Sequence, residues 1–499
     1  MKFLKQTYHY IILIIIILIS FSFYSSNFYP LLNSDDALNI LMAHYYQLPH
    51  DVYCWGQDRG GTIVPLIAQI FIKLFGCSAI TAVSFSNYLL LIAGYFGFST
   101  IFKTKSSKLL LAVIWFLPFH RFVDISRFPI GMGYSLIGVA IFFLNKLSEK
   151  TTYNTFKSHL MFMAVILTLT LAVWALDLAI VTIVILLLIL LLFKILENKK
   201  IVVNKTTLFY TIFGFIFCAL SIKLAKSFAT VTTSNHLKIN DFSGIKASLG
   251  ILKERFTEVL TFQTHEALVS IYTYCVIIFL VAFMVFVIRK KFCKKLISNK
   301  FFTFFMADFG AIFCVFLMAS WVLANEMGRW YYVACYISLS MAILLAIEIL
   351  RPYTKQIKYF QISVVFIALL GSVSTIYTMK HTYPKTLTPK LEIVKEFEQL
   401  GDIGVIAEFW NSYIMSCSNP DKIKATVHDK EYVRNQMLVD AVFERDDIYV
   451  IRDSWMKTFP DTLKQFGHIL IKEGTPFQLS DCDVCKYRKI EQDKNIRVD

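Results

Sequence analysis

Long apolar runs separated by short polar stretches fill residues 1–383 of the chain. A helix needs about 20 mostly apolar residues to cross the hydrocarbon core of a bilayer. The runs that we interpret as spans are residues 10–24, 79–102, 109–118, 131–147, 160–175, 178–193, 208–228, 269–288, 301–323, 333–350 and 360–379. The pattern predicts a polytopic α-helical membrane protein with about eleven spans.

Basic residues gather in short clusters between these runs. The clusters lie within residues 103–108, 199–205, 289–300 and 351–358. If the spans alternate in direction, all four clusters fall on the side where the chain begins, as the positive-inside rule requires. We therefore expect a cytoplasmic N-terminus and, after an odd number of spans, an outer location for the C-terminal part. The net charge of +15 is explained by these loops and does not predict nucleic-acid binding.

The composition agrees with a membrane protein. Hydrophobic residues make up 56% of the 499 positions and charged residues only 17%, whereas about a quarter of the residues of a soluble domain are charged. The interiors of the predicted spans are mostly free of charge, and the ionisable residues outside the basic clusters gather at the outer ends. This distribution favours chemistry at a membrane surface over transport, for which ionisable residues within the spans are typical.

The pattern changes after residue 383. Residues 384–499 alternate strand-like runs (404–409, 447–452 and 468–472) with helix-like runs (390–400, 432–443 and 458–466). This alternation predicts a small extracytoplasmic α/β domain. Cys482 and Cys485 lie close together, and in an exported domain a disulfide is the more typical use of such a pair than a metal site. Whether these two thiols pair is left open.

An acidic pair, Asp35-Asp36, lies in the first outer loop, residues 30–78. Asn33 or Ser34 is expected to cap a short helix that ends near Tyr46, with both aspartates in its first turn. Two adjacent carboxylates repel each other, so something must hold them. One explanation is structural, because a helix N-terminus favours negative charge. The other is functional, as a base or a metal ligand. The short run at residues 62–75 is interpreted as a second, interfacial helix.

Other polar residues are predicted at the outer ends of spans, where charge at membrane depth faces a cavity or a partner. The candidates for substrate binding are Gln57, Asp58, Arg59, Glu326, Arg329 and Tyr331. Each group has a structural alternative. Asp58 and Arg59 suit a turn that pairs with itself, residues 120–127 suit charges that reach for the interface, and Arg329 suits an anchor among aromatic residues. A further outer segment spans residues 229–268.

The acidic pair, the topology and the outer α/β domain together resemble the GT-C membrane glycosyltransferases. The most similar group is formed by the bacterial relatives of protein O-mannosyltransferases and of the lipid A aminoarabinose transferase. The resemblance implies that one of Asp35 and Asp36 acts as a catalytic base or helps to bind a divalent metal. It also implies that Arg329, followed by Trp330 and Tyr331, contacts the donor phosphate.

The sequence therefore predicts an inverting glycosyltransferase of the bacterial inner membrane. It would move a sugar from a polyprenyl-phosphate donor to an acceptor hydroxyl on a lipid, glycan or protein at the outer face. Asp35 is the expected base, Asp36 the expected metal ligand or second acid, and Arg329, with Arg59 second, the expected phosphate contact. The alternative is a transporter or flippase of lipid-linked sugars.

Overall fold

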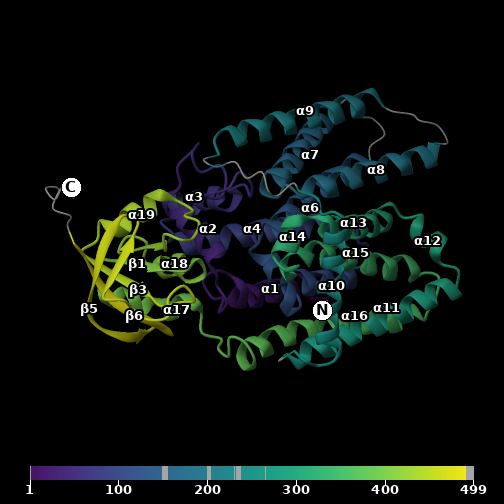
Figure 1. Ribbon diagram of the computed structural model, residues 1–499. Coiled ribbons are helices and arrows are strands. Elements are labelled where there is room, and N and C mark those ends of the chain that lie inside the picture. Colours follow the sequence, from purple (N-terminus) through teal and green to yellow (C-terminus); the bar gives the residue numbers. More distant parts are fainter. Residues whose placement is uncertain are drawn as a thin grey trace.

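The computed structural model describes residues 2–148, 155–198, 204–229, 231, 238–264 and 266–490. Figure 1 shows a large helical part and, at one end, a smaller domain built on a sheet. The elements of the helical part are α1 (Lys2–Tyr24), α2 (Ser34–Tyr45), α3 (Ile63–Phe75), α4 (Ala79–Ser99), α5 (Lys105–Phe116), η1 (His120–Ser126), α6 (Pro129–Ser148), α7 (Phe156–Ala175), α8 (Ala179–Asn198), α9 (Lys205–Ser227), α10 (Phe242–Leu260), α11 (Ala267–Arg289), α12 (Cys293–Ile297), α13 (Lys300–Met318), α14 (Ser320–Ala324), η3 (Arg329–Tyr332), α15 (Val333–Leu350) and α16 (Ile357–His381).

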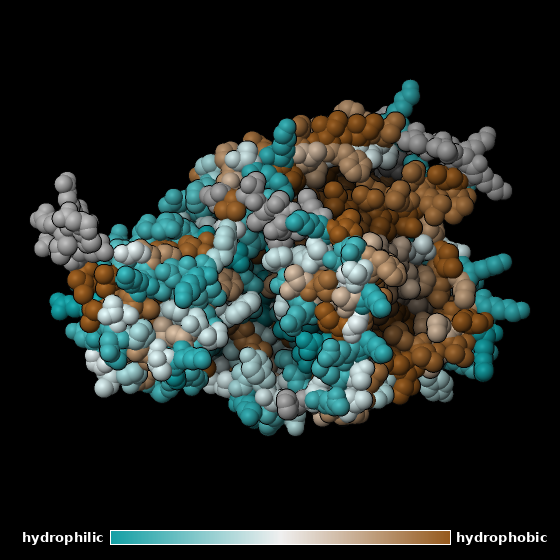
Figure 2. All heavy atoms as spheres, in the orientation of Figure 1, coloured by the Kyte–Doolittle hydropathy of each residue, from teal (hydrophilic) through white to brown (hydrophobic). Residues whose placement is uncertain are grey.

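Among the described residues, ten helices are long and apolar enough to cross a membrane. The number rises to eleven if α5 and η1 count as one span, although the chain bends by 94° between them. The predicted fold class, with about eleven spans, is confirmed. Apolar segments of this length form helices because only intrahelical bonds satisfy their backbone groups in lipid. Figure 2 shows hydrophobic residues over the helical part and hydrophilic residues over the sheet domain.

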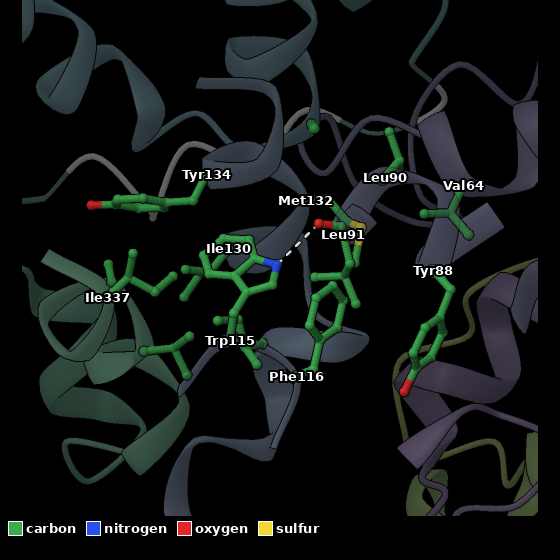
Figure 3. Packing of buried hydrophobic residues seen from close by; sticks show 14 of the residues in the cluster. Val64, Tyr88, Leu90, Leu91, Trp115, Phe116, Ile130, Met132, Tyr134 and Ile337 are labelled. Atoms are coloured by element: carbon green, nitrogen blue, oxygen red, sulfur yellow. Dashed lines mark hydrogen bonds between the residues drawn. The ribbon is translucent and has the colours of Figure 1, made fainter. Parts of the chain in front are cut away.

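The helices α4 and α6 pack closely against each other. A Cβ atom on Gly97 would lie 2.2 Å from the carbonyl oxygen of Gly138, so only glycine permits this approach. Nearby, the Trp115 indole N–H donates to the Leu91 carbonyl at 3.0 Å, within the apolar core drawn in Figure 3. Small residues at such helix crossings are a common way for membrane helices to associate.

The C-terminal domain contains one mixed sheet with helices. Its elements are α17 (Lys390–Val394), η4 (Lys395–Leu400), β1 (Ile403–Ala407), α18 (Phe409–Ser416), β2 (Ile423–Val427), α19 (Gln436–Phe443), β3 (Asp447–Ile451), β4 (Thr462–Gln465), β5 (His468–Leu479) and β6 (Cys482–Ile490). The strand order is β2-β1-β3-β6-β5-β4, in which β1 pairs in parallel with β2 and β3, and the remaining pairs are antiparallel. The expected α/β domain is present.

One local expectation in this domain was wrong, and one question that the sequence left open is answered. Residues 458–466, expected to be helical, contain strand β4, which turns into β5 through Phe466 and Gly467. Both turn residues have positive φ, 50° and 81°, as a tight two-residue hairpin requires. The open question concerns Cys482 and Cys485, which are both free thiols. They stand three positions apart in β6, and such residues point to opposite faces of a sheet, so they cannot form a disulfide.

The sheet domain packs directly on α2, the helix that carries the acidic pair. The Ser34 hydroxyl donates to the carbonyl of Phe409 at the start of α18. The Tyr45 hydroxyl, at the other end of α2, donates to the Pro420 carbonyl at 2.7 Å. Both ends of α2 are therefore tied to the C-terminal domain, and the acidic pair lies where the two parts of the protein meet.

Candidate active site

The N-terminus of α2 is capped as the sequence predicts. The Asn33 side chain accepts a hydrogen bond from the backbone N–H of Asp36 at 3.0 Å, and the Asp36 carboxylate accepts from the backbone N–H of Asn33 at 3.4 Å. This reciprocal pair is a capping box, which satisfies two of the free donors of the first turn. The structural explanation of the acidic pair therefore holds for Asp36. Asp35 takes no part in the cap.

Asp36 is also bound by a buried arginine. The guanidinium of Arg127 donates to the Asp36 carboxylate and lies over the ring of Tyr29, 3.6 Å from its centre. The side chains of Asp36 and Arg127 are 6% and 2% exposed. Burial raises the pKa of Asp36 to about 6, against the opposing effect of Arg127. The carboxylate is therefore ionised at pH 7 and paired with Arg127.

The ion pair continues into a chain of alternating charges. Arg127 lies 3.5 Å from the Asp124 carboxylate, and Arg329 donates to the other oxygen of the same carboxylate. Arg329 also donates to the Arg121 carbonyl at 3.0 Å. Four charges, from α2, from η1 and the residue that follows it, and from η3, thus form one network, which we call the charge network: Asp36, Arg127, Asp124 and Arg329. The expectation that residues 120–127 place their charges at the interface was wrong for Asp124 and Arg127, because both are buried against countercharges.

Asp35 differs from its neighbour. Within the described residues, no hydrogen bond or ion pair engages its carboxylate, and the residue is half-buried. Burial raises the pKa of Asp35, and the positive charges of Arg434 and Arg59 oppose this effect. The side chain is thus a carboxylate in a partly desolvated place beside two arginines.

Arg59 and Arg434 come to this place from distant parts of the chain. Arg59 lies in the outer loop, 4.9 Å from the centre of the Trp321 ring, and its Nε donates to the Gln57 side chain at 3.3 Å. Arg434 lies 5.0 Å from the centre of the Phe409 ring, and its buried Nε has no hydrogen-bond partner among the described residues. Neither guanidinium forms an ion pair there. Both are therefore available to an anion.

The docking of the C-terminal domain brings Arg434 to the outer loop. The Tyr432 hydroxyl donates to the Gly56 carbonyl at 2.9 Å. Gly56 has φ +70°, and a Cβ atom there would lie 2.9 Å from the Tyr432 ring and 3.3 Å from the backbone of Arg434. Glycine is required at this turn both for its backbone conformation and for the close approach.

The other predicted site residues divide into two groups. Gln57 and Asp58 stand in the same turn as Arg59, half-buried, and Tyr331 contributes a charge effect on Arg59, so these residues lie near Asp35. Glu326 does not join them: its side chain is 80% exposed and lies 3.5 Å from Arg255 of α10. Arg329 belongs to the charge network and keeps part of its guanidinium exposed.

The donor set at the acidic pair does not fit a divalent metal at Asp36. Among the described residues, no group of three His, Cys, Asp or Glu side chains could hold a metal ion. The oxygens of Asp36 accept from Arg127 and from the backbone of Asn33, and a cation beside Arg127 would be repelled. The residues around Asp36 therefore do not form a site for a divalent metal.

The sequence analysis missed one carboxylate within a span. Asp308 lies in the middle of α13 and is fully buried. The Tyr134 hydroxyl of α6 donates to its Oδ2 at 2.7 Å, and the Ser338 hydroxyl of α15 donates to the same oxygen at 2.5 Å. Its Oδ1 has no hydrogen-bond partner within the described part of the chain. A single Asp in a long apolar run gives a weak signal, so hydropathy alone did not identify it.

No protein-family model matches the chain, and no curated protein matches its sequence. Among solved structures, the apo form of ArnT from Cupriavidus metallidurans aligns with 97% of this chain and 98% of its own, at 9% identity and a TM-score of 0.47. The same protein bound to undecaprenyl phosphate covers the same shares at 9% identity, with a TM-score of 0.44.

The Archaeoglobus fulgidus oligosaccharyltransferase, in complex with Zn and sulfate, aligns with 88% of this chain and 68% of its own, at 13% identity and a TM-score of 0.40. Both proteins are GT-C fold glycosyltransferases, the class that the sequence resembles.

Proposed function

We propose that the chain is a glycosyltransferase that moves a sugar from a polyprenyl-phosphate donor to an acceptor hydroxyl. The observation behind this proposal is the contrast between the two neighbouring carboxylates. Asp36 is committed to the cap of α2 and to Arg127. Asp35 is uncommitted and lies beside Arg434 and Arg59, the positive charges that act on it most strongly. A free carboxylate beside free arginines suits proton abstraction next to an anionic leaving group.

Asp35 would serve as the general base. A base must be deprotonated at the working pH and near enough to the hydroxyl to accept its proton. Burial raises the pKa of Asp35, which makes its carboxylate a better proton acceptor than an exposed aspartate, and the positive charges of Arg434 and Arg59 favour its ionised form. Its place in the first turn of α2 fixes its direction, because the Asn33 cap and the C-terminal domain hold both ends of that helix.

Arg59 and Arg434 would bind the donor phosphate. The planar guanidinium donates two parallel hydrogen bonds to phosphate oxygens. The aromatic rings of Trp321 and Phe409 hold the two guanidinium groups in place, so less conformational freedom is lost when the phosphate binds. The exposed part of Arg329 is a third candidate, held by Asp124.

The reaction would be a single displacement. The acceptor oxygen attacks the anomeric carbon while the bond between that carbon and the phosphate oxygen breaks. The bonding electron pair leaves with the phosphate, where the arginines stabilise the added negative charge, and the hydroxyl proton passes to Asp35. Attack opposite the leaving group inverts the anomeric configuration. The products are the glycosylated acceptor and polyprenyl phosphate.

We also propose that this site lies on the outer side of the bacterial inner membrane. The basic clusters stand at the opposite ends of the spans from the acidic pair, and the positive-inside rule assigns such clusters to the cytoplasm. A lipid-linked donor suits a site at the rim of a membrane bundle, because its polyprenyl chain stays in the bilayer while its phosphate reaches Arg59.

The proposal is tested by transfer in proteoliposomes. The purified chain is supplied with undecaprenyl-phosphate hexoses labelled in the sugar, and release of undecaprenyl phosphate is measured with an extract of envelope lipids and glycans as acceptor. Transfer that requires the protein, with inverted anomeric configuration in the product, supports the proposal. Movement of the intact labelled lipid across the bilayer without release of undecaprenyl phosphate contradicts it.

One observation favours the second candidate, a transporter or flippase of lipid-linked sugars. Asp308 is an ionisable residue within a span, and such residues are often part of ion or proton pathways in transporters. Its carboxylate accepts hydrogen bonds from Tyr134 and Ser338 on two other spans, so it lies at a contact of three helices. A dependence of lipid movement on Asp308, in the absence of transfer, would favour transport.

A further inference from the structure

A second site is suggested at the opposite end of the helical bundle from Asp35. A cavity of about 480 Å³ lies between α1, α4, α5 and α6, at the end where the basic loops begin. This volume falls in the range of about 300–1,000 Å³ that is typical of small-molecule sites. The cavity shares no lining residue with the acidic pair or the charge network. It is therefore separate from the proposed active site.

The wall of the cavity is mostly apolar. Leu13 of α1, Ala93 of α4 and Val139 of α6 contribute to it, together with aromatic rings. Two of the lining rings, Tyr10 and Phe96, are about half exposed on the outside of the bundle. Because these rings face the region where lipid would surround the helices, the cavity is accessible from the bilayer and suits a hydrocarbon chain.

One end of the cavity is polar and positively charged. Lys108 of α5 and His9 of α1 line it. Two more lysines precede Lys108 in the chain: Lys103 in the loop before α5, and Lys105 as the first residue of that helix. Lys105 lies 5.7 Å from the ring of Tyr8, so its charge is directed back towards α1. This end therefore combines several positive charges with the entrance to an apolar space.

A neighbouring acidic side chain, Glu348, holds the loop before α5. Glu348 of α15 accepts hydrogen bonds from the backbone N–H of Lys103 at 2.5 Å and from the Thr104 hydroxyl at 3.0 Å. Its carboxylate is thus used to fix the loop between α4 and α5. Lys108 lines the cavity from the first turn of α5, and its carbonyl accepts from the Tyr95 hydroxyl at 3.2 Å.

We propose that this cavity binds an anionic phospholipid from the surrounding leaflet. One acyl chain would enter between α1, α4 and α6, and the phosphate would lie beside Lys108. Basic pockets between helices at the cytoplasmic side of membrane proteins are suited to acidic head groups. The apolar wall distinguishes this ligand from a free anion, which would leave the cavity empty.

The test compares lipids that differ only in the head group. The full chain in detergent is titrated with phosphatidylglycerol and with phosphatidylcholine of the same acyl chains, and the bound lipid is counted by native mass spectrometry. We expect phosphatidylglycerol to bind at least about fivefold more tightly, the factor that one lysine near a charged head group supplies at about 1 kcal/mol. Equal binding of the two lipids would overturn the proposal without any substitution.

Variants then locate the site. Lys108→Gln should reduce the preference for phosphatidylglycerol by about fivefold, and Ala93→Leu, which fills part of the apolar wall, should weaken both lipids. Lys294→Gln, at an exposed lysine of α12, is the matched control and should change neither. An equal loss in Lys294→Gln and Lys108→Gln would contradict the site. Displacement of the lipid by equimolar inorganic phosphate would show a free-anion site and would also overturn it. Because the readout is binding, it does not depend on transferase activity.

Discussion

The same substitution, Asp to Asn, is predicted to destabilise the protein far more at Asp36 than at Asp35. Asp36→Asn removes the negative charge that faces Arg127, a side chain only 2% exposed. Breaking a buried ion pair by removing one partner costs about 3–5 kcal/mol, because the other charge stays buried and unpaired. Arg127 keeps Asp124 at 3.5 Å and the face of Tyr29. We therefore expect the low end of this range, about 3 kcal/mol.

The measurement is the free energy of unfolding in mixed detergent micelles, followed by tryptophan fluorescence. Asp35→Asn is the matched control: it lies one position away on α2, loses the same charge and breaks no bond, so it should cost less than about 1 kcal/mol. The double variant Asp36→Asn/Arg127→Gln should recover part of the loss, because it also removes the unpaired charge. Equal stability of Asp36→Asn and Asp35→Asn would refute the assignment of Asp36 to a structural ion pair.

Three further predictions follow from the site and from the span that contains Asp308. Arg434→Gln should weaken binding of undecaprenyl phosphate by at least about tenfold, as expected for the loss of a charged hydrogen bond of about 1.5–3 kcal/mol. Arg488→Gln, at an exposed position of β6, is the control and should not weaken it. Equal effects of the two variants would remove Arg434 from the site. Burial raises the pKa of Asp35 and that of Asp36, the latter to about 6. Transfer should therefore fall on acidification already above pH 4, which is about the ordinary pKa of aspartate. A pH profile that stays flat down to pH 4 would exclude a buried base. Asp308→Leu should leave undecaprenyl phosphate binding within about twofold of wild type. It should change the free energy of unfolding by at least about 1 kcal/mol, because it removes the acceptor of two hydroxyl hydrogen bonds. Lost binding with an unchanged free energy of unfolding would contradict a structural role.

The sequence predicted the helical part because its signals are local. Apolar runs of about 20 residues identify spans by composition alone, and Asn33 followed three residues later by Asp36 marks a helix start. The break between α5 and η1 was harder to predict from the sequence. The run at residues 109–118 is only half the usual length of a span, and the 94° bend after it falls at the break of residues 117–119.

The partners of the site residues could not be predicted, because they depend on contacts between distant parts of the chain. Arg434 lies in the C-terminal domain, 399 positions beyond Asp35, and its charge acts on Asp35 because Tyr432 docks that domain on the turn at Gly56. Arg329 was expected to be the main phosphate contact, yet Asp124 on another element already binds it. Sequence shows which charges are at the outer ends of spans, but the pairing decides which of them are free to bind a substrate.

The central claim is that Asp35, and not Asp36, is the base of a sugar transfer. The direct measurement is the initial rate of release of undecaprenyl phosphate from labelled undecaprenyl-phosphate hexoses by wild type and Asp35→Asn in matched proteoliposomes. General-base catalysis contributes about 10²–10⁴-fold to a rate, so Asp35→Asn should lose at least about 10²-fold in kcat while it keeps wild-type stability and undecaprenyl phosphate binding. A folded Asp35→Asn protein that transfers sugar at the wild-type rate would contradict the claim.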